Sequence, residues 1–383
     1  MTPGARASAA IEVLDRILAG DPAERALTNW GRASRFAGSG DRAAVRDLVF
    51  DALRRRRSAA ALGGGLTGRG LVLGLCREAG NEALFSGDGH APLPTTEADQ
   101  TRTPTSDEAL DAPDWLLPDL RESLGPDCAA VLQTLRMRAP VFARVNMRKT
   151  DNAGALATLA RDGITARPHP LAPTAIEITG NARKLQASAA YQEGFIELQD
   201  AASQAIVDVL PLADGMRVLD HCAGGGGKTL AMAARARLLL YAHDIAPRRM
   251  ADLPPRARRA GVEVSLTDTP EALAPYDLVL VDAPCSGSGS WRRDPEGKWA
   301  LTPGRLTALT DLQAQILRRA AAMVSPGAWL AYATCSLLRR ENRTQIDGFL
   351  SGTAGFALQR EVMLTPLSGG DGFYLALMRR TGA

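Results

Sequence analysis

The second half of the chain alternates between short apolar runs of strand character and amphipathic runs of helix character, and no other feature restricts its fold as strongly. This alternation predicts an α/β fold, in which a mostly parallel sheet carries helices on both faces. Ligands of such sheets bind beyond the carboxyl ends of the strands. The expected strands lie at 217–222, 239–245, 262–267, 276–283 and 328–334, the helices at 201–210, 247–260, 305–323 and 340–350, and two closing strands at 357–364 and 372–379.

The turn after the first of these strands is unusually rich in glycine. Residues 220–229 read DHCAGGGGKT and lead directly into a strong helix-forming run. Glycines let a backbone come close to a ligand, and a helix N-terminus offers free N–H groups and a partial positive charge. The turn therefore predicts a cradle for a nucleotide or nucleoside cofactor, with a flexible loop as the alternative.

Two acidic residues end the next two strands. Asp244 is placed to accept hydrogen bonds from ribose hydroxyls, and it is also a good cap for the helix that follows. Asp268 closes the third strand, where it is in position to approach an adenine edge or to cap a helix. Both carboxylates extend the predicted cofactor site.

Two cysteines follow the fourth and fifth strands. Cys285 stands in a Ser/Gly loop just after Asp282, and Cys335 directly follows the run Ala331-Tyr332-Ala333-Thr334. Adjacent parallel strands bring their carboxyl ends together, so we expect both thiols and the carboxylate to face one cleft. That combination suits covalent chemistry on a base or a carbonyl group.

Three motifs carry a resemblance to a known family. DHCAGGGGKT, DAPCSGSG and YATCS are similar to motifs of the RsmB/Nop2/Sun family of RNA cytosine-C5 methyltransferases, which use S-adenosylmethionine. The match covers roughly residues 190–380. The N-terminal sequence RFAGSGDRAAVRDLVFDALRRR resembles the NusB-like RNA-binding domain of bacterial members. One departure is Gly225, where the family usually has a proline, and this change loosens the turn without removing a ligand group.

The resemblance implies a mechanism and a set of site residues. Cys335 would add as a thiolate to C6 of cytosine, and Lys228 would favour that thiolate. Asp282 would hydrogen-bond the N3/N4 edge of the base, and Cys285 would help to release the product. The implied S-adenosylmethionine site comprises Cys222, Ala223, Gly224, Gly225, Gly226, Gly227, Lys228, Asp244, Asp268 and Asp282.

The chain is expected to contain three domains. Residues 1–125 form a helical, NusB-like RNA-binding domain that includes a linker or exposed loop at 86–113. Residues 126–192 form a small α/β domain of ferredoxin-like or RRM-like type, and 193–383 form a Rossmann-like methyltransferase domain with a seven-stranded sheet.

Two basic segments are candidates for RNA contact. The run of four arginines at 54–57 is either a phosphate-binding patch or a solvated helix end. In the segment WRRDPEGKWA, Arg292 and Arg293 are expected to hold RNA phosphate and Trp299 to stack a base, with a charged loop around a buried tryptophan as the alternative.

Composition restricts the class of protein further. With 45% hydrophobic and 23% charged residues, the chain is typical of globular proteins and not of disordered or membrane-embedded ones. It has no apolar run of membrane-spanning length and no signal-peptide pattern, so we expect a cytoplasmic location. Five cysteines without regular spacing favour free thiols over disulfides or a metal site. The net charge of +3 is weak evidence for a polyanionic partner.

The leading hypothesis is a monomeric, metal-free RNA m5C methyltransferase that acts on 16S rRNA through a covalent adduct between Cys335 and C6. Transfer RNA is an alternative substrate. A DNA cytosine methyltransferase would instead use Cys285 as its nucleophile. A non-catalytic RNA-binding or antitermination factor is the alternative from another class of protein.

Overall fold

The computed structural model describes residues 1–382, and the chain forms two compact units. Unit 1 comprises Met1–Arg138 together with Trp291–Ala300. Unit 2 comprises Ala139–Ser290 and the chain from Leu301 onward. The segment Trp291–Ala300 thus belongs to unit 1, although both of its flanks belong to unit 2.

Unit 1 is built from helices around one apolar core. Its first helix begins after Thr2, whose hydroxyl accepts from the Ala5 N–H, and it buries Ala10, Val13 and Leu14 at helical spacing. The helices of this unit are α1 (Pro3–Leu18), α2 (Ala23–Ala33), α3 (Ser39–Arg54), α4 (Arg56–Gly63), α5 (Gly68–Glu78), α6 (Leu117–Leu124), α7 (Cys128–Leu135) and α13 (Pro295–Ala300).

The stretch 86–113, expected to be a linker or an exposed loop, is attached to the helices of unit 1. Asp99 pairs with Arg69 at 2.9 Å. Asp111 is buried and accepts hydrogen bonds from the backbone N–H groups of Arg57 and Ser58, both at 2.9 Å. The carboxylate therefore satisfies donors at the start of α4 that no helical carbonyl reaches.

Among residues 1–382, no single helix is long and apolar enough to cross a membrane. Within that range, only α4 and α5 taken together have the necessary length and composition, and their axes bend by 88° at the break between them.

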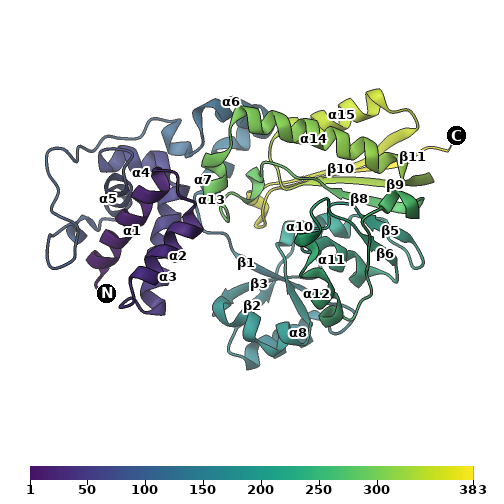
Figure 1. The fold of residues 1–383 in the computed structure, drawn as a ribbon, viewed down its shortest axis with the longest axis horizontal. Coiled ribbons are helices and arrows are strands. Elements are labelled where there is room, and N and C mark those ends of the chain that lie inside the picture. The colour runs from purple at the N-terminus through teal and green to yellow at the C-terminus, as the bar shows by residue number, and fades with distance from the viewer. Residues whose placement is uncertain (383) are drawn as a thin grey trace. The chain divides into compact units, whose positions relative to one another are not determined.

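Unit 2 contains a small four-stranded sheet. Its strands are β1 (Val141–Val145), β2 (Thr165–Pro168), β3 (Ala175–Gly180) and β4 (Ile196–Leu198), in the order β2-β3-β1-β4 with antiparallel pairing. Helix α8 (Asn152–Arg161) packs through Ala155 and Leu159 onto Ile176 and Ile178 (Figure 1), and α9 (Ala189–Gln192) precedes β4.

The larger sheet of unit 2 has seven strands in the order β10-β11-β9-β8-β5-β6-β7. The neighbours from β9 to β7 pair in parallel, while β10 and β11 pair antiparallel, so the prediction of a mostly parallel seven-stranded sheet is confirmed. The strands are β5 (Arg217–Asp220), β6 (Leu239–Ala242), β7 (Ser265–Leu266), β8 (Tyr276–Asp282), β9 (Val324–Thr334), β10 (Phe356–Leu364) and β11 (Phe373–Arg380).

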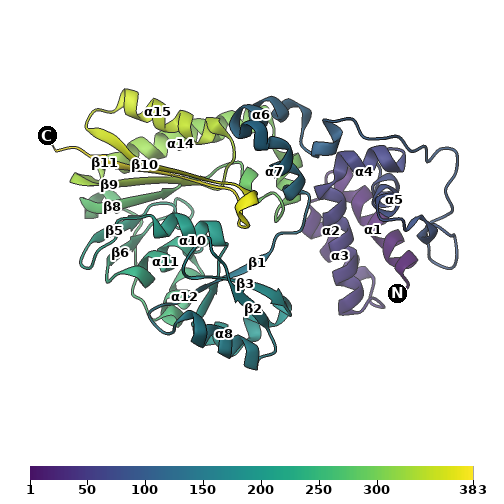
Figure 2. The same ribbon diagram turned by 180° about the vertical axis from the view of Figure 1, so that it is seen from behind.

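Helices cover both faces of this sheet, as the alternating pattern predicts (Figures 1 and 2). One face carries α10 (Ala201–Asp208), α11 (Gly227–Arg235) and α12 (Leu253–Ala260), and the other carries α14 (Pro303–Ala322) and α15 (Arg343–Gly352). Strand β8 is buried on both sides because Leu278 and Leu280 pack in one core and Val279 and Val281 in the other.

Several elements end earlier than the sequence predicts, and two differ most. The third strand, expected at 262–267, is reduced to Ser265–Leu266 at the sheet edge. The helix expected at 247–260 is divided into a 3-10 turn at Pro247–Met250 and α12. Prolines at 254 and 255 lack the N–H of a helix interior, so a new helix begins at them instead of continuing through them.

Close contact between α4 and α5 depends on glycine, and Gly74→Ala should therefore destabilise unit 1. A Cβ at Gly74 would lie 2.0 Å from the Ala59 carbonyl oxygen. We expect a cost of about 1–3 kcal/mol, the usual range for overpacking, measured by thermal or urea unfolding. The matched control is Gly40→Ala in α3, where a Cβ meets nothing within 4 Å. Equal stability of the two variants would contradict the account.

Candidate active site

The glycine turn connects β5 to α11 and adopts a conformation that side chains would oppose. Gly224 and Gly226 have φ of 50° and 79°, and a Cβ on Gly226 would lie 2.2 Å from Leu253. Gly225, the departure from the family pattern, is not in the left-handed region, and its carbonyl accepts a hydrogen bond from Arg256. The turn is therefore held by a side chain from α12 as well as by its own backbone.

Asp244 follows β6, and its side chain holds the glycine turn in place. Its carboxylate is buried and accepts hydrogen bonds from the N–H groups of Gly224 at 3.0 Å and Ala246 at 2.9 Å. Arg249 lies 3.3 Å from the same carboxylate. Each carboxylate oxygen has a further lone pair, so these contacts leave capacity for a ribose hydroxyl.

Beside Asp244 lies a hollow of about 200 Å³. Ile245, which is 82% exposed, Pro284 and Leu312 give it apolar walls. His221 and His243 stack in it with ring centroids 5.1 Å apart. Burial lowers the pKa of His221 to about 4, so this ring is neutral at physiological pH. Apolar walls, the neutral imidazole of His221 and the adjacent Asp244 carboxylate fit an adenosine group.

Asp268 is not brought to this hollow. It follows the short edge strand β7, its side chain is exposed, and the hollow is lined by other residues. Its assignment to the cofactor site stays a prediction.

Lys228 and Asp282 form an ion pair at the carboxyl edge of the sheet. The Lys228 Nζ lies 2.6 Å from Asp282 Oδ2. Burial lowers the pKa of Lys228, but the charge and the hydrogen bond of Asp282 outweigh burial, so that its pKa is raised. The ammonium is therefore charged, and it also lies 4.8 Å from the Phe373 ring centroid.

The two predicted thiols lie together. Cys285 and Cys335 are 3.4 Å apart between their Sγ atoms, in the loops that follow β8 and β9, which pair in parallel with Asp282 opposite Ala333. The hydrogen bond between the two thiols lowers the pKa of Cys335, and burial opposes this effect. The same contact raises the pKa of Cys285. Cys335 is thus the better thiolate, and Cys285 is the thiol that supports it.

A buried glutamate that the sequence analysis missed joins the two thiol loops. Glu341 accepts hydrogen bonds from the Ser286 N–H at 2.8 Å, from Gln313 Nε2 at 3.0 Å and from the hydroxyls of Ser286 and Ser336. Glu341 is fully buried. In the sequence it stands among charged residues, a pattern typical of a surface, so only its distance of a few residues from Cys335 could have drawn attention to it.

The segment after the Cys285 loop differs from the expectation for RNA contact. Arg292 is only 3% exposed, so its prediction as a phosphate clamp is wrong. Trp299 donates its Nε1–H to the Leu53 carbonyl at 2.6 Å within unit 1. Arg293 is exposed. The alternative of a charged loop around a buried tryptophan describes Trp291, which is 1% exposed.

Comparisons with known proteins agree with this geometry. Residues 207–378 match the model of a family described as 16S rRNA methyltransferase RsmB/F. Residues 112–183 match the ferredoxin-like domain of RsmF/B-like methyltransferases. The second match overlaps the four-stranded sheet, and the first covers most of the seven-stranded sheet with the glycine turn and both thiols.

Curated relatives extend over more of the chain. The ribosomal RNA small subunit methyltransferase B of Xanthomonas campestris is 35% identical over 252 residues, which are 63% of this chain and 57% of that protein. The protein of the same name from Salmonella agona is 32% identical over 290 residues, which are 71% of this chain and 67% of that protein. The chain thus spans 57% to 67% of the length of these two relatives.

Solved structures share the fold. The crystal structure of PH0851 matches with a TM-score of 0.75 at 22% identity, over 99% of both chains. The structure of NSun6 from Pyrococcus horikoshii with SFG matches with a TM-score of 0.61 at 16% identity, over 71% of this chain and 99% of that chain. At these identities the likeness shows the fold alone, a Rossmann-like methyltransferase sheet.

Glu341→Ala should loosen the thiol pair and destabilise unit 2. The substitution removes the acceptor of buried donors on Ser286, Ser336 and Gln313, at about 1–3 kcal/mol for each donor that finds no other partner. We expect a lower unfolding midpoint, and a loss of the preference of iodoacetamide for Cys335 over Cys285 as mapped by mass spectrometry. Glu263→Ala, at an exposed glutamate, is the control. An unchanged preference in the Glu341 variant would count against its role.

Proposed function

The chain belongs to the RsmB/F family of 16S rRNA methyltransferases, and from this premise we propose that it methylates C5 of a cytosine in 16S rRNA, with S-adenosylmethionine as the methyl donor. The observation that carries the proposal is the pair of thiols at 3.4 Å beside the Lys228–Asp282 ion pair. An aromatic carbon such as cytosine C5 is a weak nucleophile, and a thiolate that adds to the neighbouring C6 activates it.

The chain's own residues fit the methyl donor. The backbone from Cys222 to Lys228 and the carboxylate of Asp244 would hold its amino-acid and ribose parts, and the hollow between Ile245 and Pro284 would take its adenine. When bound, S-adenosylmethionine supplies an electrophilic methyl group on a sulfonium. The left-handed glycines of the turn support this assignment because they let the backbone approach the ligand closely.

The thiols divide the remaining chemistry between them. Cys335, as thiolate, forms a bond to C6, and the electron pair of the C5–C6 double bond makes C5 nucleophilic. Once C5 carries the methyl group, its proton passes to solvent, the electrons of that C–H bond restore the double bond, and the bond from Cys335 to C6 breaks with its electron pair returning to the Cys335 sulfur. Cys285, which donates to the Cys335 sulfur, is placed to assist this elimination.

Asp282 positions the base. Its carboxylate, held by Lys228, would accept hydrogen bonds from the N4 amino group and from an N3–H, which stabilises the charge that develops when the thiolate adds. The base has to leave any stack to reach these residues. The name of the relatives, ribosomal RNA small subunit methyltransferase B, supports 16S rRNA over tRNA as the substrate.

The direct test incubates the purified chain and S-adenosylmethionine with 16S rRNA, 30S particles and tRNA. Nucleosides are then quantified by mass spectrometry, and we expect 5-methylcytosine in 16S rRNA. The proposal fails if neither naked rRNA nor the particle gains it, and tRNA methylation alone would move the substrate to the alternative class.

Single cysteine substitutions distinguish nucleophile from helper. Cys285→Ala should accumulate a covalent protein–RNA adduct, because Cys335 still adds to C6 and elimination is slowed. Cys335→Ala should form none and lose activity by several orders of magnitude. Denaturing gels with labelled RNA check both, and the reverse pattern would assign the nucleophile to Cys285, as a DNA-type enzyme requires.

The contact between the thiols also predicts a pH effect. Cys285 lowers the pKa of Cys335, so removing it raises that pKa and reduces the thiolate fraction at low pH. The acid limb of adduct formation in Cys285→Ala should therefore lie at higher pH than the acid limb of single-turnover methylation in the wild type. An unshifted limb would mean that Cys285 does not set the charge of Cys335.

A further inference from the structure

Unit 1 has a hollow of about 670 Å³, formed wholly by its own residues. Helix α4 and the turn after it, the chain around residues 100–114, and α13 contribute to its lining. It combines apolar surface with polar and charged groups, among them Arg56, Ala61, Leu66, Gln100, Thr101 and Trp299. Two carboxylates also line it, and each is paired with an arginine of the same lining: Asp114 with Arg57 and Glu108 with Arg102. A hollow of this size has room for one nucleotide, and the composition of its lining decides what kind of ligand it suits.

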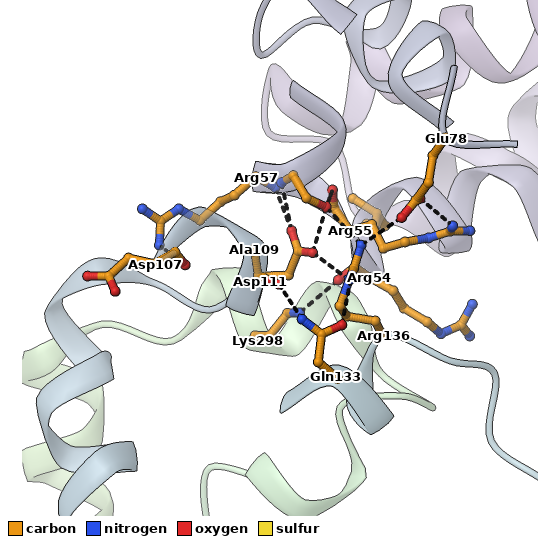
Figure 3. A network of polar contacts seen from close by, with 12 residues as sticks. Arg54, Arg55, Arg57, Glu78, Asp107, Ala109, Asp111, Gln133, Arg136 and Lys298 are labelled. Atoms are coloured by element: carbon orange, nitrogen blue, oxygen red, sulfur yellow. Dashed lines mark hydrogen bonds and ion pairs between the residues drawn. The ribbon is translucent and has the colours of Figure 1, made fainter. Parts of the chain in front are cut away.

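Most of the basic run at 54–57, where α3 ends and α4 begins, is already used inside unit 1. Arg54 donates to the Arg292 carbonyl and to Asp51, both at 2.8 Å. Arg55 pairs with Glu78 at 2.8 Å, and Arg57 pairs with Asp114 at 2.5 Å. Figure 3 shows the polar network that surrounds this run: Asp111 pairs with Arg136, Lys298 donates to the Arg54 carbonyl, and the Arg55 guanidinium reaches Glu78. They are structural, and neither the phosphate patch nor the solvated helix end describes them.

Arg56 is different from its three neighbours. Among residues 1–382 its guanidinium has no carboxylate partner and no hydrogen bond, although the side chain is partly buried. It lies 5.2 Å from the centroid of the Trp299 ring. A partly desolvated cation without a counter-charge at the edge of a hollow favours an anionic ligand.

The other groups around the hollow complement that cation. Trp299 is fixed because its Nε1–H is donated to the Leu53 carbonyl, so the ring that backs Arg56 does not reorient easily. Gln100 and Thr101 are exposed, and within the described chain their side chains make no hydrogen bonds. Leu66 is 51% exposed and adds apolar surface.

We propose that this hollow binds one nucleotide of the substrate RNA, with its phosphate on Arg56 and its base against the apolar surface, where Gln100 and Thr101 meet the base edge. Single-stranded RNA offers this combination of an anion and a planar, unpaired base. The inference rests on the proposed function for the identity of the RNA. Trp299 lies in α13, in the segment of the chain that connects the Cys285 loop to α14.

The test compares full-length variants for binding of in-vitro-transcribed 16S rRNA at several salt concentrations, without S-adenosylmethionine. Arg56→Ala should raise Kd and KM about tenfold, leave kcat unchanged, and reduce the slope of log K against log salt by about one, as the loss of one phosphate contact requires. The matched control is Arg32→Ala, an exposed arginine of α2 outside this hollow, which should bind like the wild type.

A second variant keeps the test decisive if Arg56→Ala is unstable. Leu66→Glu places a negative charge at an exposed position of the hollow and should weaken RNA binding to a similar extent while the unfolding midpoint stays unchanged. Wild-type affinity in both variants overturns the inference. Binding is measured without the methyl donor, so the two proposals can fail separately. A wild-type chain that binds rRNA but forms no 5-methylcytosine would refute the proposed function, while the binding of the two variants would still decide this inference.

Discussion

The parallel pairing of β8 with β9 is the constraint on which the site depends. Because Asp282 lies opposite Ala333, β8 and β9 end at the same level of the sheet, and the loops that carry Cys285 and Cys335 begin side by side. Strand pairing alone brings loops to the same edge but does not set sulfur positions to within a few tenths of an ångström. The buried carboxylate of Glu341 supplies that restraint, since it accepts from both loops.

Because the Cys285 and Cys335 sulfurs lie only 3.4 Å apart, the pKa values of the two thiols shift in opposite directions. A hydrogen bond between neighbouring thiols stabilises one thiolate at the expense of the other, and here it favours Cys335. No histidine is needed for that activation, and His221 and His243 lie instead in the hollow next to Asp244. Lys228 adds positive charge to the same region while it fixes Asp282. The hydrogen bond from the neighbouring thiol and the charge of Lys228 therefore both favour ionisation of the Cys335 sulfur.

Sequence reasoning was reliable where the signal is local. The alternation of strands and helices predicted the sheet, and the two thiols, which were expected to face one cleft because they follow adjacent strands, lie 3.4 Å apart. It failed where a residue's role depends on distant partners. Glu341 has the sequence surroundings of a surface residue, and Arg57 finds Asp114 only through the tertiary fold. The buried position of Arg292 follows from the inclusion of its segment in unit 1, which no local pattern reveals.

The most direct measurement of the central claim is the identity of the cysteine that bonds to the base in the unmodified protein. RNA in which the target cytosine carries fluorine at C5 cannot lose a C5 proton, so the adduct should persist after methyl transfer. Digestion and mass spectrometry of the trapped complex would locate the nucleotide. The account predicts attachment to Cys335. Attachment to Cys285, or the absence of any adduct under conditions that give methylation of ordinary RNA, would contradict it.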